Sequence, residues 1–344
     1  LKELSGEVKA LAERAREAEA ELQVLLRTLP NLPDPAAPAG GDETLREVGK
    51  PRSDLAPARD HLELAGERID MERGTRLSGA RFAYLRGDLV MLELALVRWA
   101  LETVRGHGFE PVIPPVLVRE EALYGTGFLP DTEQQIYHLP ADDLYLVGTS
   151  EVALASLHAG EILDAAQLPV RYAGFSPCFR REAGAAGRDT RGIFRVHQFD
   201  KVEMFSFVEP GASPGEHERI LGVEEEILSA LDIPYRVVNI AAGDLGASAA
   251  KKYDCEAWLP GQGAFRELTS CSNTTDFQAR RLEIRMRAEG DRPQVLHTLN
   301  GTAVAVGRTI VALLENGQRE DGSVTLPECL VAYGAPPELP SAPD

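Results

Sequence analysis

The chain lacks the features of a membrane protein, of a disulfide-rich fold and of a metal site built from cysteines. Its 344 residues include four cysteines, Cys178, Cys255, Cys271 and Cys329. No two of them have the spacing of metal ligands, and four are too few for a disulfide-rich fold. No apolar run approaches the roughly 20 residues that span a bilayer, and we expect no secretory leader. We therefore expect a protein of the reducing cytoplasm, without zinc and without membrane contact.

Positive charge is also scarce. The sequence has 36 Lys and Arg residues against 54 Asp and Glu residues, a net charge of −18. This balance argues against a protein that coats nucleic acid generally, although it leaves room for a local basic surface. The apolar share of 44% and charged share of 26% are ordinary for a globular protein of one or two domains. Because the chain begins at Leu1 rather than Met, we expect an N-terminal piece to be absent.

Two common nucleotide-binding loops are also missing. The sequence has neither a GxxxxGK[ST] loop nor a Rossmann glycine fingerprint. Predicted strands outnumber helices, and several are joined as hairpins, which favours a mostly antiparallel α+β domain over a doubly wound one. If ATP binds, side chains carried by strands must therefore hold it.

The first 29 residues carry the clearest pattern that is present. Apolar or small residues recur in alternating steps of three and four, as in the seam of a coiled coil. No later segment has matching heptads, so the facing helix is either missing or belongs to another copy. The alternative is an amphipathic helix docked on the body. Residues 30–42 then hold four prolines and two glycines and read as a linker. The seam positions are Leu1, Leu4, Val8, Leu11, Ala15, Ala18, Leu22, Leu25 and Leu29.

A predicted hairpin carries an unusual set of charges. Its strands, Cys178–Glu182 and Gly192–Phe207, flank the polar loop Ala183–Arg191. Residues of one parity share a face of a strand. One face of the hairpin is therefore either a platform for a polyphosphate and a stacked base or an ordinary solvated surface, and the pattern leaves both open. The residues on that face are Arg180, Glu182, Arg195, His197, Phe199, Lys201 and Glu203, while Phe194, Val196, Val202 and Met204 point the other way.

Four other segments offer candidate functional residues. Residues 108–118 contain three prolines, which fits an edge or interface strand or a core strand that ends in a loop. Residues 148–151, after a short strand, read as a ligand-contacting loop or a helix cap. A helix over 277–288 would place Arg281 and Arg285 on one face, either solvated or binding phosphate. Arg308 lies in an apolar helix over 302–316, where a charge is rare unless paired or functional.

We further expect helices over 60–71, 82–105 and 214–231 and a helix-like run from 151 to 163. We expect strands over 144–147, 235–241, 253–259, 264–270 and 295–299, and a turn at Asn300-Gly301.

Taken together, these segments resemble a class II aminoacyl-tRNA synthetase of the bacterial seryl family. GFEPVIPPVLV (108–118) is similar to motif 1, FRREAGAAGRDTRGIFRVHQFDKVEMF (179–205) to motif 2 and NGTAVAVGRTIVALLEN (300–316) to motif 3. Pieces typical of the seryl family are SGARF (78–82), TSE (149–151) and RELTSCSNTTDFQARR (266–281). The resemblance covers essentially the whole chain.

The resemblance implies a fold and an activity. The fold is an antiparallel sheet flanked by helices, preceded by part of an N-terminal coiled-coil helical arm. Residues 1–29 would be the second helix of that arm, without its partner helix, 30–45 the linker and 46–344 the catalytic domain. The enzyme would be a homodimer whose arm grips the long variable arm of serine tRNA across the dimer. It would activate L-serine with ATP and Mg²⁺ and transfer it to the 3′-hydroxyl of serine tRNA, and also of selenocysteine tRNA. The alternative is a synthetase-like paralogue with a non-tRNA acceptor or a regulatory role.

The resemblance also implies roles for individual residues. It gives no role to residues 246–255, because their sequence departs from the family pattern. It makes the loop Ala183–Arg191 the part expected to move. Candidate basic contacts for tRNA are Arg280, Arg281, Arg285, Arg287, Lys2, Lys9, Arg14 and Arg16. The catalytic residues would be Arg180, Arg308 and Glu267, with Glu267 and Ser270 holding Mg²⁺. The ATP site would comprise Arg180, Arg181, Glu182, Val196, Phe199, Glu267, Leu268, Thr269, Ser270 and Arg308, and the serine site Thr149, Ser150, Glu151, Arg180, Glu203, Asn300 and Thr302.

Overall fold

An eight-stranded sheet forms the centre of the molecule in the computed structural model, which describes residues 2–52, 54–55, 57–130, 135–183, 189 and 191–342. Neighbouring strands pair antiparallel except at one edge, where β4 runs parallel to β9. The predicted antiparallel α+β fold is confirmed. In spatial order the strands are β1 (Glu43–Val48), β11 (Tyr235–Asn239), β12 (Lys251–Leu259), β13 (Ala264–Thr275), β16 (His297–Ala305), β10 (Gln198–Val208), β9 (Val170–Phe179) and β4 (Glu110–Val112).

Three long helices cover this sheet: α4 (Asp88–Gly106), α7 (Ser213–Ala230) and α9 (Val306–Gly317). Helix α7 packs on β13 and β16, α9 on β10 and β12, and α4 on β9 and β10. In α4 the buried residues include Leu89, Leu92 and Leu96, a spacing that puts them on one face of a helix. Their side chains join those of the sheet in the largest apolar core.

Smaller elements surround this core. They form a sheet of β5, β6 and β7, a sheet of β8, β14 and β15, and two strand pairs, β2–β3 and β17–β18. Their bounds are α2 (His61–Ala65), β2 (Ile69–Asp70), α3 (Met71–Ser78), β3 (Tyr84–Leu85), β5 (Leu117–Val118), α5 (Glu120–Thr126), β6 (Tyr137–Leu139), β7 (Leu144–Leu146), α6 (Glu151–Ala155), β8 (Ile162–Asp164), α8 (Phe277–Arg281), β14 (Arg285–Arg287), β15 (Gln294–Val295), β17 (Val324–Thr325), α10 (Glu328–Val331) and β18 (Glu338–Leu339), with short 3-10 turns at Gly66–Arg68, Ser156–His158, Ala165–Gln167 and Pro210–Ala212.

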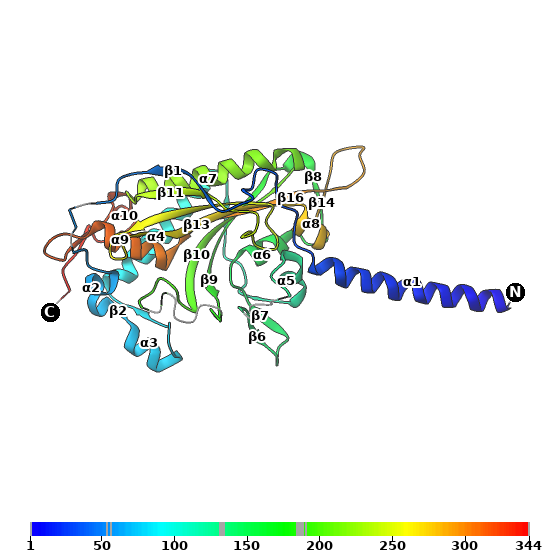
Figure 1. The fold of residues 1–344 in the computed structure, drawn as a ribbon, viewed down its shortest axis with the longest axis horizontal. Coiled ribbons are helices and arrows are strands. Elements are labelled where there is room, and N and C mark those ends of the chain that lie inside the picture. The colour runs from blue at the N-terminus through cyan, green and yellow to red at the C-terminus, as the bar shows by residue number, and fades with distance from the viewer. Residues whose placement is uncertain are drawn as a thin grey trace.

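The N-terminal helix α1 (Lys2–Thr28) projects away from the body (Figure 1). The apolar seam along it lies in solvent: Leu4, Val8 and Leu11 are each about 60% exposed. The alternative of an amphipathic helix docked on the body is therefore wrong. The exposed seam is what a coiled-coil helix without its facing partner presents.

The proline-rich segment 108–118 is confirmed as an edge. Its strand β4 is the last strand of the large sheet, and Ile113 just beyond it is 83% exposed. A proline has no N–H to donate, and an edge strand tolerates it because that strand has a neighbour on one side only.

One predicted helix and one predicted turn are wrong in the C-terminal third of the chain. The expected helix over 277–288 ends at Arg281, because Glu283 takes a left-handed φ of 56° and the chain then forms β14. Arg281 and Arg285 therefore share no helical face. The expected turn at Asn300-Gly301 is also wrong, because β16 runs straight through it and α9 begins only at Val306. Gly301 is needed where α7 crosses the sheet: a Cβ there would lie 2.3 Å from Ile220 Cγ2.

Other boundaries also differ from the sequence pattern. The second hairpin strand begins at Gln198 instead of Gly192, and the first ends at Phe179. Segment 60–71 is split into α2, a 3-10 turn and β2, and the helix expected from residue 82 begins at Asp88, after Gly87 with its positive φ. The helix-like run after residue 151 stops at Ala155 and continues as a 3-10 turn. In segment 60–71, the pairing of β2 with β3 has overridden the local helical periodicity.

Candidate active site

A cavity of about 580 Å³ lies over the middle strands of the large sheet, beside the hairpin. Its walls come from the ends of β7 and β9, from β10, β13 and β16, from the first turn of α9 and from the loop before β12. Most of the predicted site residues meet there, although their segments are far apart in the chain. Those that line it are Thr149, Glu151, Arg180, Glu182, Val196, Phe199, Glu203, Glu267, Leu268, Thr269, Ser270, Asn300, Thr302 and Arg308.

Arg180 follows directly after β9 and is held in place at one side of its guanidinium. Its Nε donates to Gly148 O at 3.1 Å, and the guanidinium lies 5.4 Å from the ring centre of Phe199. Among the described residues, no group bonds its two Nη atoms. Beside it, Glu182 accepts from Arg195 Nη1 at 2.7 Å. A guanidinium fixed at Nε can present a two-pronged donor to an anion in the cavity.

A second cation, Arg308, lies in the first turn of α9. The Arg308 guanidinium lies 4.8 Å from the ring centre of Phe194, and its Nη1 donates to Glu267 O at 3.0 Å. Arg266 stacks on Phe194 at 4.5 Å. Burial raises the pKa of Glu267, but the charges of Arg308 and Lys252 outweigh this and hold it below its usual range. Glu267 is therefore a carboxylate at neutral pH, next to positive charge.

The opposite end of the cavity holds two buried acidic side chains, Glu203 and Glu151. Glu203 on β10 is 2% exposed and stands directly across from Thr302 on β16, whose hydroxyl donates to its Oε2 at 3.2 Å. Lys201 Nζ lies 2.5 Å from Glu203 Oε2 and donates to Thr149 Oγ1 at 2.7 Å. One ammonium is therefore already bound between a carboxylate and a hydroxyl.

Glu151 forms the floor beside that end. Its Oε1 accepts from Gln278 Nε2 at 2.7 Å and from Asn300 Nδ2 at 2.9 Å. Burial, followed by the nearby negative charge of Glu203, raises the pKa of Glu151 to about 7. The folded protein therefore keeps a proton on Glu151 that the unfolded chain loses near pH 4.

This raised pKa gives a prediction for stability. The stabilisation from protonated Glu151 is full below the unfolded pKa and is lost as the pH rises through about 7. We expect the unfolding free energy of the wild type to fall between pH 5 and pH 7.5 by up to about 3 kcal/mol more than that of Glu151→Gln. Urea unfolding of both proteins at the two pH values measures this difference, and parallel pH profiles would contradict it.

A few predicted residues are directed elsewhere. Arg181 is exposed and does not line the cavity; its N–H donates to Gln135 O. Ser150 is fully buried and donates to Gly174 O, also outside the cavity. Thr269 reaches the cavity wall, but its hydroxyl donates to Glu224 on α7. His197 was expected on the charged face, yet it packs against Phe82 and Tyr137, since regular alternation begins only at Gln198.

The structure adds cavity residues for which the sequence pattern indicated no role. Phe194 was expected to face away from the charged side, but it carries the two stacked arginines. The cavity is also lined by Gly246, Ser248 and Ala249. They lie in segment 246–255, whose sequence departs from the family pattern. Lys252, two residues before Asp254 on β12, pairs with it at 2.9 Å. The alternation of side chains along β12 could have indicated that Lys252 faces the cavity. Of the loop expected to move, residues 184–188 and 190 lie outside the described residues.

Comparisons with known proteins agree with this geometry. The class II core domain of tRNA synthetases (G, H, P, S and T) matches residues 137–317. The chain is similar to the serine–tRNA ligase of Acidothermus cellulolyticus, at 59% identity over 340 residues that cover 96% of this chain and 80% of that one. The ligase of Thermobifida fusca is 56% identical over 336 residues, 96% of this chain and 79% of its own.

Two solved structures have the same fold. Seryl-tRNA synthetase from Pyrococcus horikoshii, complexed with ATP, superposes with a TM-score of 0.96 at 44% identity and covers 99% of this chain and 83% of its own. The cytoplasmic serine–tRNA ligase of Naegleria fowleri, in complex with AMP, has a TM-score of 0.90 at 35% identity, covering 97% and 81%.

The sheet, the cavity and the matched core domain define a class II aminoacyl-tRNA synthetase. Within that class, the chain belongs to the serine–tRNA ligase family. The resemblance indicated by the three motifs is thereby confirmed.

Proposed function

We propose that this chain activates L-serine with ATP in the 580 Å³ cavity and transfers it to serine tRNA, and also to selenocysteine tRNA. The observation that carries this proposal is the polarity of the cavity. Two guanidiniums, Arg180 and Arg308, stand at one side, and the pair Glu203–Thr302 stands at the other. The first set fits a polyphosphate, and the second fits a small substrate with an ammonium and a hydroxyl.

The first chemical step needs no general base. The serine carboxylate is ionised at pH 7 and attacks the α-phosphorus of ATP; the bond to the bridging oxygen breaks, and pyrophosphate leaves with that electron pair. The site must align the reactants and stabilise charge on the phosphorus. Arg180 would do this with its two Nη groups, while Phe199 would stack on adenine and the backbone at Val196 would contact the base.

The anionic end would select serine. Lys201 Nζ now bridges Glu203 and Thr149, the groups that the serine ammonium and hydroxyl would contact. Its position supports a subsite built for an ammonium. Alanine keeps the ammonium but lacks the hydroxyl, so the side chain that binds the serine hydroxyl would be left unpaired, which costs up to about 10⁴-fold in specificity. Threonine would be excluded only by lack of room for its methyl group.

A divalent cation fits the phosphate side. Magnesium takes oxygen ligands, and Glu267, with its lowered pKa, and the Ser270 hydroxyl both line the cavity. We propose that these two residues hold Mg²⁺, which would neutralise charge on the phosphates. Among the described residues, no group of three or more His, Cys, Asp or Glu side chains could hold a metal ion. The phosphates of ATP would therefore have to supply further ligands.

Serine-dependent exchange of pyrophosphate into ATP tests the activation step. We expect exchange that requires serine and magnesium, falls to background when EDTA removes the metal, and is not supported by alanine. ATP binding without exchange would favour the alternative of a synthetase-like regulatory protein or of a relative with a non-tRNA acceptor.

In the second step the 3′-hydroxyl of the terminal ribose of tRNA would attack the seryl carbonyl carbon and release AMP. We propose that residues 1–29 form one helix of the tRNA-binding arm, 30–45 the linker and 46–344 the catalytic domain of a homodimer. The projecting α1 with its exposed seam supports this division. Removing residues 2–28 should leave exchange intact and lower charging of serine tRNA; equal charging by both proteins would refute the role of the arm.

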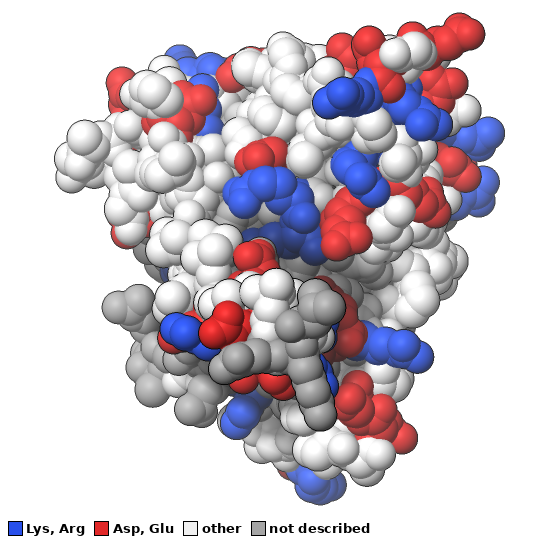
Figure 2. Space-filling model, turned by 90° about the vertical axis from the view of Figure 1, so that its right-hand side faces the viewer, with Lys and Arg blue, Asp and Glu red and all other residues white. Residues whose placement is uncertain are grey.

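We expect tRNA to contact separate small groups of basic side chains and not one continuous basic surface. On the face from which α1 projects, basic and acidic side chains are interspersed (Figure 2). Arg280 pairs with Asp276, and Arg281 stacks on Phe277 at 3.8 Å and donates to Leu29 O, so both have other partners. Arg285 and Arg287 are exposed on β14 and are the better candidates there.

Two findings bear on the cellular setting. All four cysteines are free thiols, which supports our proposal of a reducing compartment such as the cytoplasm. None of the helices within the described ranges is long and apolar enough to cross a bilayer.

A further inference from the structure

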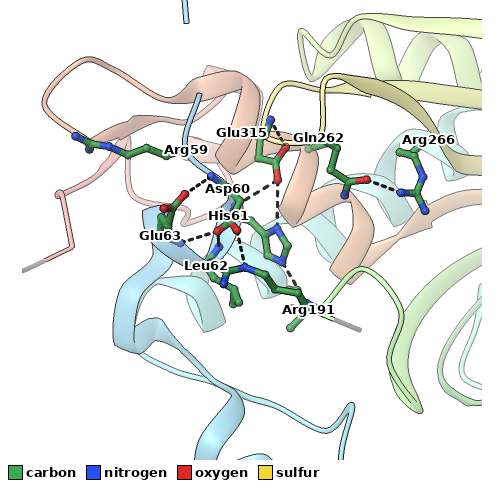
Figure 3. Close-up of polar contacts among 12 residues, drawn as sticks. Arg59, Asp60, His61, Leu62, Glu63, Arg191, Gln262, Arg266 and Glu315 are labelled. Carbon is green, nitrogen blue, oxygen red and sulfur yellow. Dashed lines mark hydrogen bonds and ion pairs between the residues drawn. The ribbon is translucent and has the colours of Figure 1, made fainter. Parts of the chain in front are cut away.

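A buried histidine outside the cavity joins the motif 3 helix to the hairpin. His61 is the first residue of α2 and is 4% exposed, and Glu315 on α9 is fully buried. The two side chains face each other, with His61 Nδ1 3.2 Å from Glu315 Oε1 (Figure 3). Neither residue lines the cavity, and the mechanism above gives neither a role.

The hydrogen bonds around the ring fix the position of its proton. The Ile193 N–H donates to His61 Nε2 at 3.2 Å. A ring nitrogen that accepts carries no hydrogen, so in the neutral ring the proton lies on Nδ1, which donates to Glu315. Glu315 is itself fixed by the N–H groups of His61, at 3.3 Å, and of Gly261, at 2.9 Å, in the β12–β13 turn. The imidazole is therefore held in one tautomer and one orientation.

The chain beside Ile193 is packed tightly onto this ring. Gly192 has a φ of 75°, and a Cβ at that position would lie 1.9 Å from His61 Nε2. One residue earlier, Arg191 Nε pairs with Asp60 Oδ2 at 2.7 Å, while Asp60 also caps α2. The start of α2 thus holds three consecutive residues on the C-terminal side of the hairpin loop.

These contacts determine where a wall of the cavity lies. Ile193, Phe194 and Arg195 all line it, directly after the anchored Gly192. Arg308 stacks on the ring of Phe194, and Arg195 donates a hydrogen bond to Glu182. A shift at Ile193 would therefore move both groups on the proposed phosphate side.

We propose that His61 is a positioning residue for ATP: its Nε2 holds Ile193, and Glu315 orients the ring. The proposal rests on the ATP site assigned above. Asn and Gln separate the two contacts, because the amide nitrogen of Asn reaches the position of Nδ1 and the amide oxygen of Gln that of Nε2. His61→Asn keeps the donor to Glu315 and loses the acceptor for Ile193, whereas His61→Gln does the reverse.

The test compares these two variants by steady-state exchange kinetics and by amide hydrogen exchange. We expect His61→Asn to raise the KM for ATP about tenfold, the effect of losing one hydrogen bond, with the KM for serine unchanged and His61→Gln within about threefold of the wild type. Amide exchange of residues 191–196 should accelerate in His61→Asn alone. Arg191→Gln, which alters only an exposed side chain, should raise the KM for ATP in the same direction.

Equal behaviour of the two histidine variants, whether both are normal or both are equally impaired with a common fall in Tm, would overturn the proposal. So would greater impairment of His61→Gln, or an unchanged KM for ATP in Arg191→Gln. Amide exchange needs no substrate. A wild-type protein that lacked serine-dependent exchange would therefore refute the proposed function, while the protection of residues 191–196 would still decide whether His61 anchors this segment.

Discussion

Arg180→Ala is expected to lower the rate of serine-dependent ATP–pyrophosphate exchange by about 10²- to 10³-fold, the usual effect of removing one preorganised donor to a developing oxyanion. The arginine Nε is already anchored on Gly148 O, so its fork needs no reordering when ATP arrives. The main loss should appear in kcat, because charge on the α-phosphoryl group changes most in the transition state.

Two further variants sharpen this expectation. Arg180→Lys keeps the charge but cannot donate to Gly148 and fork an anion at the same time, so it should recover only part of the rate. Arg319→Ala removes a half-exposed arginine that pairs with Glu338 away from the cavity and should exchange like the wild type. Wild-type kcat in Arg180→Ala would remove Arg180 from the chemistry and leave Arg308 as the main cation.

The sequence pattern located the active hairpin because period-two alternation is a local property. Phe199, Lys201 and Glu203 were placed on one face from parity alone, and all three line the cavity. The alternation fails just before them, at His197, because the chain there contacts the SGARF segment as well as Arg180. His197 N donates to Arg81 O, and its ring packs on Phe82.

Contacts between distant segments could not be predicted from periodicity. Glu203 meets Thr302 because a bulge shifts the register of β10 on β16, a detail set by packing of the sheet. The apparent turn at Asn300-Gly301 misled for a related reason: Gly301 is required by the close approach of α7 and not by a change of direction. The buried pair His61–Glu315 joins residues 254 positions apart, and neither segment carries a local pattern that signals it.

The second large effect is expected at the anionic end. Glu203→Gln keeps the size of the side chain and removes its charge. Loss of one partner in a buried, charged hydrogen bond costs about 2–5 kcal/mol. We therefore expect the KM for serine in the exchange assay to rise by at least about 30-fold. ATP binding, measured by calorimetry without serine, should change little, because Glu203 lies at the opposite end from Arg308.

One complication is the neighbouring ammonium. Without the Glu203 charge, Lys201 stays buried with only the Thr149 hydroxyl, and this alone could destabilise the site. The double variant Lys201→Met/Glu203→Gln removes the stranded charge and separates the two effects. If Glu203 binds the substrate ammonium, the double variant recovers thermal stability but not serine affinity. Recovery of serine affinity would show that Glu203 acts only as the counter-ion of Lys201, and near-normal exchange in Glu203→Gln would remove it from the serine site.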